Sequence, residues 1–205
     1  RVGPDGSGRS VPMPFANTPH RYGAVTKLLH WAVFVLVVYQ FIGANLMTRI
    51  GKGSFLGLGQ NGWYEWHKSI GLVLLALMAV RLLWRRMTRL PDWSPLLTPS
   101  ERHLSHRLEW LVYAVLIALP VSGYLFVMLG GFGVKLFDRW PLPRPFDKQP
   151  DAANWAWGLH IALAYAAVVF IAWHVGHGLK KHLDSGGRFL QRMLPQRSRG
   201  RDVPH

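Results

Sequence analysis

One stretch of the sequence, residues 155–177 (WAWGLHIALAYAAVVFIAWHVGH), is long and apolar enough to cross a lipid bilayer as a single helix. It carries two histidines, His160 and His174, which are fourteen residues apart. On an α-helix this separation corresponds to a rise of ~21 Å and four turns less ~40°, so both imidazoles are predicted to face one direction at two depths. Neutral imidazole is a common metal ligand. A lone histidine on an apolar face is more often a hydrogen-bonded core residue, so the prediction depends on facing histidines elsewhere.

Three further apolar runs have a similar length. The four runs cover roughly residues 26–47, 67–84, 108–129 and 155–179. Half of the 205 residues are hydrophobic although the net charge is +14, a combination that is unusual for a soluble protein. The pattern predicts an all-α membrane protein, a bundle of four transmembrane helices.

The distribution of basic residues predicts the orientation of these helices. With four spans, both termini and the second loop lie on one side, which carries seventeen Lys and Arg residues. The cytoplasmic side of a membrane protein is enriched in Lys and Arg. Both termini are therefore expected on the cytoplasmic side, with the chain crossing the membrane four times. The basic residues flank apolar runs and form no RNA-binding motif, which argues against a nucleic-acid partner. The opposite side carries six: Arg49, Lys52, Lys135, Arg139, Arg144 and Lys148.

Composition divides the chain into three parts. Residues 1–19 are rich in Gly, Pro and polar residues and are expected to form a flexible leader. Residues 20–185 contain the four apolar runs and form the predicted transmembrane domain. Residues 186–205 form a basic cytoplasmic tail, expected to lie against anionic membrane lipid.

Two other histidines match the depths of the first pair. His30 lies about one turn inside the cytoplasmic end of the first run, level with His174, and His67 begins the second run at the outer side, level with His160. The chain has no cysteine, which excludes iron–sulfur clusters and covalent haem attachment. The pattern predicts two noncovalent haems b, each with its iron between two of these histidines. In a haem-free scaffold, the alternative, the same histidines would hydrogen-bond between helices.

Residues near the inner pair are candidates for haem contacts. Arg81 follows His67 by fourteen residues and so lies on the same helix face at the cytoplasmic level. Its guanidinium either pairs with haem propionates or extends to lipid headgroups. His177 is expected to contact the inner haem indirectly or to donate a proton. His106, at the cytoplasmic mouth of the third run, is a rival ligand nearer the surface.

The outer side supplies a second group of candidates. Lys68, Lys135 and Arg139 are expected to attract an anion toward the outer haem, and Lys68 is also a candidate for tuning that haem. The segment 130–154, which contains four prolines among aromatic residues, either forms part of a substrate or quinone mouth or is an ordinary surface loop. Gly123 in the third run permits close approach of a neighbouring helix.

Several motifs in order resemble the bacterial cytochrome b561 family from about Arg21 to Pro195. They are RYGAVTKLLHW, WHKSIGLVLLALMAVRLLWR, SHRLEWLVYAVLIALPVSGYL, GLH with a second histidine fourteen residues on, and HLDSGGRFLQRMLP. The resemblance implies a four-helix diheme protein of the inner membrane, with axial histidines on the first, second and fourth spans. By motif these are His30, His67, His160 and His174. One departure is Glu109, where relatives carry a histidine, which weakens a proton or quinone role there.

The resemblance also implies electron exchange with ubiquinone, and some similar members oxidise superoxide at the periplasmic side. The resulting hypothesis is transmembrane electron transfer through two haems b. The chain acts either as a quinone-linked superoxide oxidase or as a membrane-anchoring subunit that relays electrons for a larger redox complex. The sequence alone leaves both alternatives open.

Overall fold

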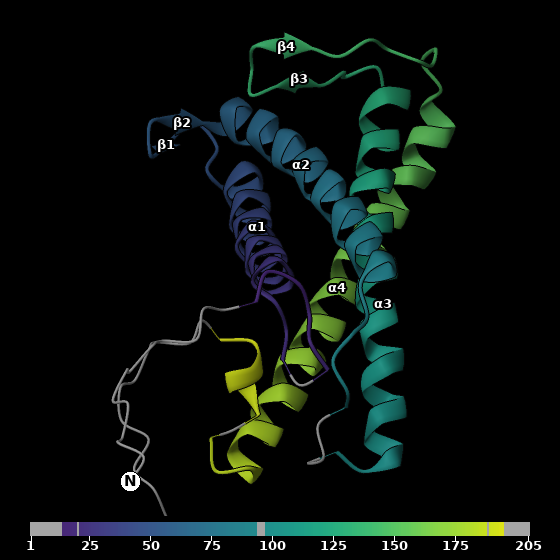
Figure 1. Ribbon diagram of the computed structural model, residues 1–205. Coiled ribbons are helices and arrows are strands. Elements are labelled where there is room, and N and C mark those ends of the chain that lie inside the picture. Colours follow the sequence, from purple (N-terminus) through teal and green to yellow (C-terminus); the bar gives the residue numbers. More distant parts are fainter. Residues whose placement is uncertain (1–13, 20, 94–96, 188, 195–205) are drawn as a thin grey trace, which may run out of the picture.

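The computed structural model describes residues 14–19, 21–93, 97–187 and 189–194 (Figure 1). Residues 1–13 of the predicted leader and residues 195–205 of the predicted tail lie outside the described part of the chain.

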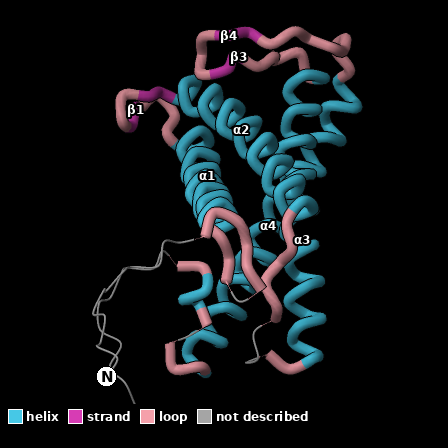
Figure 2. The backbone as a smooth tube through the Cα atoms, in the orientation of Figure 1, coloured by secondary structure: helices cyan, strands magenta, loops and turns pink. Residues whose placement is uncertain are grey.

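Four long helices make up most of the described structure, as Figure 2 shows. Of these, α1, α3 and α4 are each long and apolar enough to cross a membrane, and they are the helices of the described residues that meet both criteria. The helix α2 has 28 residues, a sufficient length, but it is less apolar because it carries Glu65, Lys68 and several arginines. The predicted helical bundle with membrane spans is thus confirmed, and α2 as a fourth span stays a prediction. The helices are α1 (Ala24–Arg49), α2 (Gln60–Met87), α3 (Pro99–Leu129) and α4 (Pro150–Asp184).

Two small β-hairpins connect helices at one end of the molecule, whereas the α2–α3 connection lies at the opposite end (Figure 1). The first hairpin pairs β1 (Ser54–Phe55) with β2 (Leu58–Gly59), and the second pairs β3 (Lys135–Leu136) with β4 (Trp140–Pro141). Successive helices therefore run in opposite directions. We call the hairpin end the outer end and the opposite end the inner end, after the orientation expected from the charges.

The helices pack as two neighbouring pairs, α1 with α2 and α3 with α4, and α2 joins the pairs by packing on α3. A cluster of buried apolar side chains fills the middle of the bundle, between the depths of the two histidine pairs. By contrast, α4 exposes many large apolar side chains, as expected for a helix that faces lipid. The central cluster comprises Val33, Val37, Leu74, Met78, Tyr113 and Leu116.

The inner end is held together by polar contacts. Thr98 and Glu101 form a reciprocal capping box at the start of α3, which satisfies backbone N–H groups that a helix start leaves free. The segment that follows α4 contains a short 3-10 helix, η1 (Leu190–Arg192), and returns to the start of α1. There Lys27 Nζ donates to the carbonyl of Leu194 and Trp31 Nε1 to that of Met193, each at 3.0 Å.

Candidate functional site

The four predicted ligands lie in two pairs, each joining different helices. His67 of α2 faces His160 of α4 near the outer end, and their ring centroids are 6.4 Å apart. His30 of α1 faces His174 of α4 toward the inner end, with a centroid separation of 6.3 Å. The structure therefore brings together the same partners that the depth argument pairs, although α1 and α4 are not among the closely packed helices.

Both separations fit an iron ion held between two imidazoles. A metal–nitrogen bond of about 2.0–2.1 Å on each side, plus about 1.1–1.2 Å from ring nitrogen to ring centroid, gives a centroid separation of about 6.2–6.6 Å. Two rings in direct edge-to-face contact also have centroids about 4.5–7 Å apart, so the separation is compatible with a shared iron and with direct packing. Within residues 14–19, 21–93, 97–187 and 189–194, no cluster of three or more His, Cys, Asp and Glu side chains could hold a metal ion.

The ring of His160 is oriented by hydrogen bonds to residues of α3 on either side of Pro120. Its Nδ1 lies 2.9 Å from the carbonyl oxygen of Leu119 and 3.3 Å from Oγ of Ser122. A carbonyl only accepts hydrogen bonds, so Nδ1 carries the proton and Nε2 is left as the basic nitrogen. A carbonyl partner of this kind fixes the tautomer of a metal-binding histidine.

Gly123 provides the space that this ring occupies. A Cβ atom at position 123 would lie 2.8 Å from Cε1 and 2.9 Å from Nδ1 of His160. Any larger residue would push the imidazole away from its place on α3. The close approach predicted for Gly123 is thus made by the ring of a candidate ligand on α4.

His67 is fixed through its backbone. Gln40 of α1 donates from Nε2 to the carbonyl oxygen of His67 at 3.0 Å. Gly71 makes room for this amide, because a Cβ there would lie 3.0 Å from the Gln40 nitrogen. The Nδ1 atom of His67 is buried and has no hydrogen-bond partner among the described residues. The two outer histidines therefore differ in how they are held: His160 by hydrogen bonds to its ring, and His67 by a hydrogen bond to its backbone.

The inner pair has a different electrostatic environment. Arg81 Nη2 lies 3.2 Å from Nδ1 of His30, and Arg81 Nε donates to the hydroxyl of Tyr113 at 2.8 Å. A guanidinium can only donate, so Nδ1 of His30 accepts in this arrangement and its proton is on Nε2. For Nε2 to bind iron, the Nδ1 must take the proton and the guanidinium must turn its donor elsewhere. Carboxylates such as haem propionates are suitable partners for that donor.

The remaining predicted residues make other contacts. Nε2 of His177 lies 3.1 Å from the hydroxyl of Ser105 on α3, so it links the inner ends of α3 and α4. Lys68 forms an ion pair with Glu65 at 2.6 Å and donates to the carbonyl of Gly133 at 3.1 Å. The Lys68 ammonium therefore holds the outer loop against α2. The arginine expected at lipid headgroups or propionates, Arg81, points into the bundle as described above.

Some contacts of the site were missed in the sequence. The Leu119 carbonyl and the Tyr113 hydroxyl have no signal in a single sequence, because they depend on how helices pack. The contact of Gln40 does have a sequence signal, since Gln40 is a polar residue within an apolar run. Glu109 has a clearer one: an acid at the start of a span requires a partner, and it forms an ion pair with Arg85.

Known proteins resemble this chain over most of its length. A sequence model described as prokaryotic cytochrome b561 matches residues 21–196. The chain is 30% identical over 190 residues to cytochrome b561 homolog 2 of Escherichia coli (strain K12), covering 91% of this chain and 97% of the relative. It is 25% identical over 181 residues to the probable superoxide oxidase CybB of Yersinia pestis, covering 86% and 97%. The matched range is nearly the one in which the motifs resemble the family.

Proposed function

Because the chain belongs to the prokaryotic cytochrome b561 family, and is therefore a haem b protein of a bacterial membrane that transfers electrons across it, we propose that it holds two haems. The outer haem lies between His67 and His160, and the inner haem between His30 and His174. The observation that carries this proposal is that four histidines from three helices lie in two facing pairs near opposite ends of the bundle, with centroid separations of 6.4 and 6.3 Å that leave room for an iron. The proposed topology has four spans, including α2, in the inner membrane with both termini cytoplasmic.

A haem held by two histidines would have no open coordination position, so it would supply outer-sphere transfer of one electron at a time. The residues of the chain hold and orient this chemistry. The Leu119 carbonyl keeps the proton of His160 on Nδ1, and Arg81 places a positive charge beside the inner site. The apolar cluster between the two depths excludes water from the path of the electron.

We assign ubiquinone as the electron acceptor and superoxide as the electron donor. Superoxide gives up one electron and becomes dioxygen, and two such electrons with two protons convert a quinone to a quinol. The relative named as a probable superoxide oxidase supports this assignment. The basic residues Lys135 and Arg139 of the outer loop favour approach of an anion.

The second candidate function is that of a membrane-anchoring subunit that relays electrons for a larger redox complex. The described chain is almost entirely membrane helices and short connections, so a relay of this kind requires a partner protein. Both functions use the same two haem sites and differ only in the donor.

Purification in mild detergent, haem quantification and a superoxide assay together test the proposal. We expect two low-spin haems b per chain, reduced by superoxide and reoxidised by added ubiquinone. Two haems with a stoichiometric companion protein and no response to superoxide would favour the relay. A folded protein that binds no haem would overturn both functions.

A further inference from the structure

The first hairpin, β1–β2, carries a large apolar side chain at its tip. Leu56 is 79% exposed, and its neighbour Phe55 is 49% exposed. The two central residues of the turn both have positive φ, 51° at Leu56 and 76° at Gly57. Two-residue turns of this kind favour asparagine, aspartate or glycine, and a leucine in this conformation is strained. An exposed leucine adds little to the packing of the hairpin, so the reason for it lies outside the hairpin.

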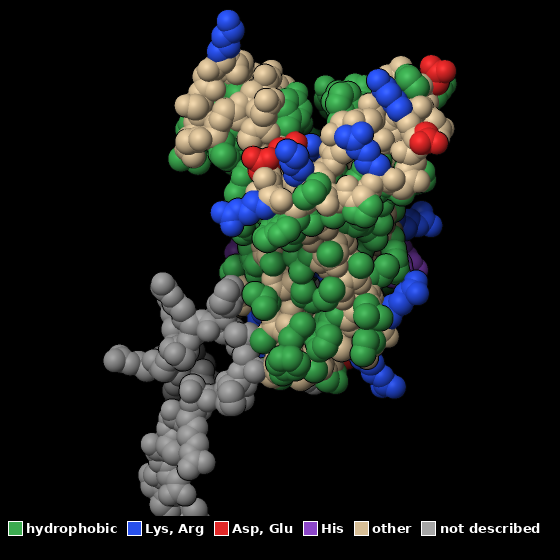
Figure 3. All heavy atoms as spheres, turned by 90° about the horizontal axis from the view of Figure 1, so that it is seen from above, with side chains coloured by type: hydrophobic (Ala, Val, Ile, Leu, Met, Phe, Trp, Pro, Cys, Tyr) green, Lys and Arg blue, Asp and Glu red, His purple; other side chains and the backbone are tan. Residues whose placement is uncertain are grey.

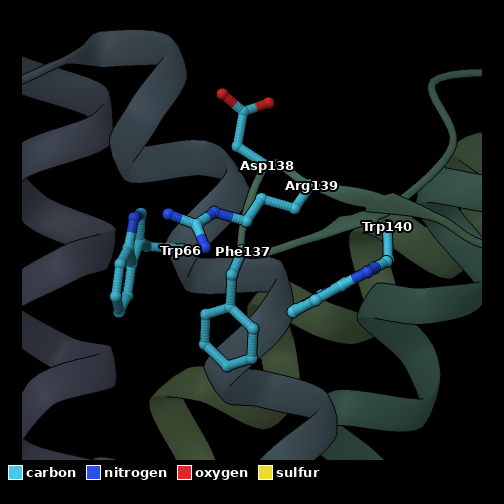
Figure 4. Close-up of a pocket in the computed structure, with 5 residues that line it drawn as sticks. All are labelled: Trp66, Phe137, Asp138, Arg139 and Trp140. Atoms are coloured by element: carbon cyan, nitrogen blue, oxygen red, sulfur yellow. The ribbon is translucent and has the colours of Figure 1, made fainter.

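The second hairpin, β3–β4, has the opposite arrangement at its turn. Phe137 and Asp138 also have positive φ, 50° and 58°. The ring of Phe137 packs edge to face on Trp66 of α2, with centroids 5.3 Å apart, whereas the exposed Asp138 side chain points away from both rings (Figure 4). This hairpin turns its apolar side chain toward the bundle and a charge toward water. The first hairpin turns its leucine outward.

The first hairpin lies at the level where α1 reaches the lipid headgroups. The 26 residues of α1 correspond to a length of about 39 Å. The hydrocarbon core of a bilayer is about 30 Å thick, and the whole bilayer with its headgroups is about 40–45 Å thick. A membrane-spanning α1 therefore ends among the headgroups, shortly before β1 begins. The hairpin projects sideways from the outer ends of α1 and α2, whereas the second hairpin lies across the outer end of the bundle (Figure 1).

Ring stacking holds the first hairpin against the bundle. Phe55 stacks on Trp63 of α2, with centroids 6.3 Å apart and an angle of 27° between the rings. Trp63 is only 3% exposed, so the ring beneath Phe55 belongs to the interior of the protein. The outer half of α1, which leads into the hairpin, exposes Val38 and Ile42 one turn apart, as expected for a helix that faces lipid. The tip at Leu56 therefore extends from a fixed base that follows a lipid-facing segment.

The charges around the first hairpin are those that suit lipid phosphates. Arg49 and Lys52 are both exposed, and residues 49–64 contain no Asp or Glu. Tyr64, at the start of α2, is 40% exposed. Tyrosine is enriched where a membrane meets water, and long basic side chains there extend to the headgroups. The acidic side chains visible from above lie near the centre and at the right of the molecule (Figure 3), whereas the first hairpin lies at its left in Figure 1.

We infer that the first hairpin is an interfacial membrane anchor. Leu56 and Phe55 enter the boundary between headgroups and acyl chains at the outer membrane surface, and Arg49 and Lys52 contact lipid phosphates. Burial of the leucine side chain removes apolar surface from water, which offsets the strain of its backbone. Lipid fits this tip better than a soluble protein does, because the tip projects sideways at the level of the headgroups. The anchor does not depend on the ligation of haem.

Spin labelling of single-cysteine variants tests the inference, because the chain contains no cysteine of its own. A nitroxide is attached to the full chain at Leu56→Cys, and the protein is reconstituted into vesicles of phosphatidylcholine and phosphatidylglycerol. Power-saturation EPR compares collisions with dioxygen, which concentrates among acyl chains, and with a nickel chelate, which stays in water. We expect dioxygen collisions to dominate, at a depth of about 5–10 Å. The matched control is Asp138→Cys in the second turn, where collisions with the chelate should dominate.

A second pair of variants tests the native leucine, because the nitroxide is itself apolar. The label is placed at Ser54→Cys, an exposed position in β1, with Leu56 present or replaced in Leu56→Asn. Asparagine suits a turn of this kind, so the hairpin keeps its form and loses only its apolar tip. We expect the ratio of dioxygen to chelate collisions at residue 54 to fall in Leu56→Asn.

Three results would overturn the inference. If the label at residue 56 meets the nickel chelate as often as the label at residue 138 does, the tip lies in water. If neither reagent reaches the label at residue 56, or if its spectrum shows dipolar broadening that disappears on dilution with unlabelled chains, a protein partner or a second copy of the chain covers the tip. If the collision ratio at residue 54 is the same with and without Leu56→Asn, the leucine does not hold the hairpin at the membrane.

Discussion

The two pairs both consist of two histidines at nearly the same spacing, but the groups next to the Nδ1 atoms differ: a hydrogen-bond acceptor at the outer pair and a cation at the inner pair. At the outer pair, a backbone carbonyl accepts the Nδ1 proton of His160. At the inner pair, the cation of Arg81 lies against Nδ1 of His30. An acceptor at Nδ1 makes a histidine a stronger donor to iron, whereas a nearby positive charge favours the reduced iron. With the two proposed haems bound, this difference predicts a higher electron affinity at the inner site than at the outer site, so that electrons run inward.

The comparison requires first that the two sites be separable. His160→Ala removes one outer ligand, so we expect haem content to fall from two per chain to one, with the inner haem retained. Pyridine haemochromogen assays against protein concentration measure this ratio. The matched control is His106→Ala, which removes an exposed histidine that contacts Trp110 and should leave two haems. If His160→Ala retained two haems, or if His106→Ala retained only one, the proposed ligand assignment would be wrong.

Gly123→Ala tests whether the outer site depends on close packing against α3. The new Cβ would lie 2.8 Å from the His160 ring, and overpacking of this kind costs about 1–3 kcal/mol. We expect the outer haem to be lost at a lower temperature and the inner haem to be unaffected. The absorbance of the haems during heating measures both losses. Gly178→Ala is the control on α4, because its Cβ would make only an ordinary 3.7 Å contact with Leu190. Equal effects of the two substitutions would contradict the proposed role of Gly123.

Arg81→Gln addresses the electrostatic difference directly. Removal of the cation should lower the midpoint potential of the inner haem, on the order of 60 mV if the interaction is worth ~1.4 kcal/mol. Potentiometric titration monitored by absorbance resolves the two haems and should show the outer potential nearly unchanged. Arg86→Gln removes an exposed arginine from the same helix and controls for net charge. An equal shift in both variants would show that the position of the Arg81 charge beside the inner site is unimportant.

The pairing of the histidines could be predicted from sequence because it depends on two regular quantities, the rise and the rotation of an α-helix. A spacing of fourteen residues on one apolar run, matched by depth on two others, is enough to pair His67 with His160 and His30 with His174. The helices themselves follow from the apolar runs. The structure extends α1 by two residues and α4 by five at each end, extends α2 by seven residues at its start and three at its end, and extends α3 by nine residues at its start only. The observed family match agrees with the order of the motifs.

The contacts around the rings could not be predicted in the same way. Arg81 was expected at propionates or headgroups, but its direction depends on the Tyr113 hydroxyl across the α2–α3 packing. The carbonyl of Leu119 became a partner of His160 only through the close approach at Gly123. Both depend on helix rotation, which periodicity leaves undetermined within tens of degrees. The turn at Phe137 was also missed, since positive φ is usually signalled by glycine, which is not present there.

Tyr113→Phe gives the smallest expected effect and tests what holds Arg81 in place. The substitution keeps the ring beneath the guanidinium and removes only the hydroxyl that accepts from Arg81 Nε at 2.8 Å. Without this bond the charge remains but its position is less fixed, so the inner potential should fall by less than in Arg81→Gln. In the Arg81→Gln background, Tyr113→Phe should have no further effect, because the two residues then act through one contact. Additive shifts in the double variant would mean that Tyr113 influences the inner site independently of Arg81, and the contrast between the two pairs would no longer rest on a single cation.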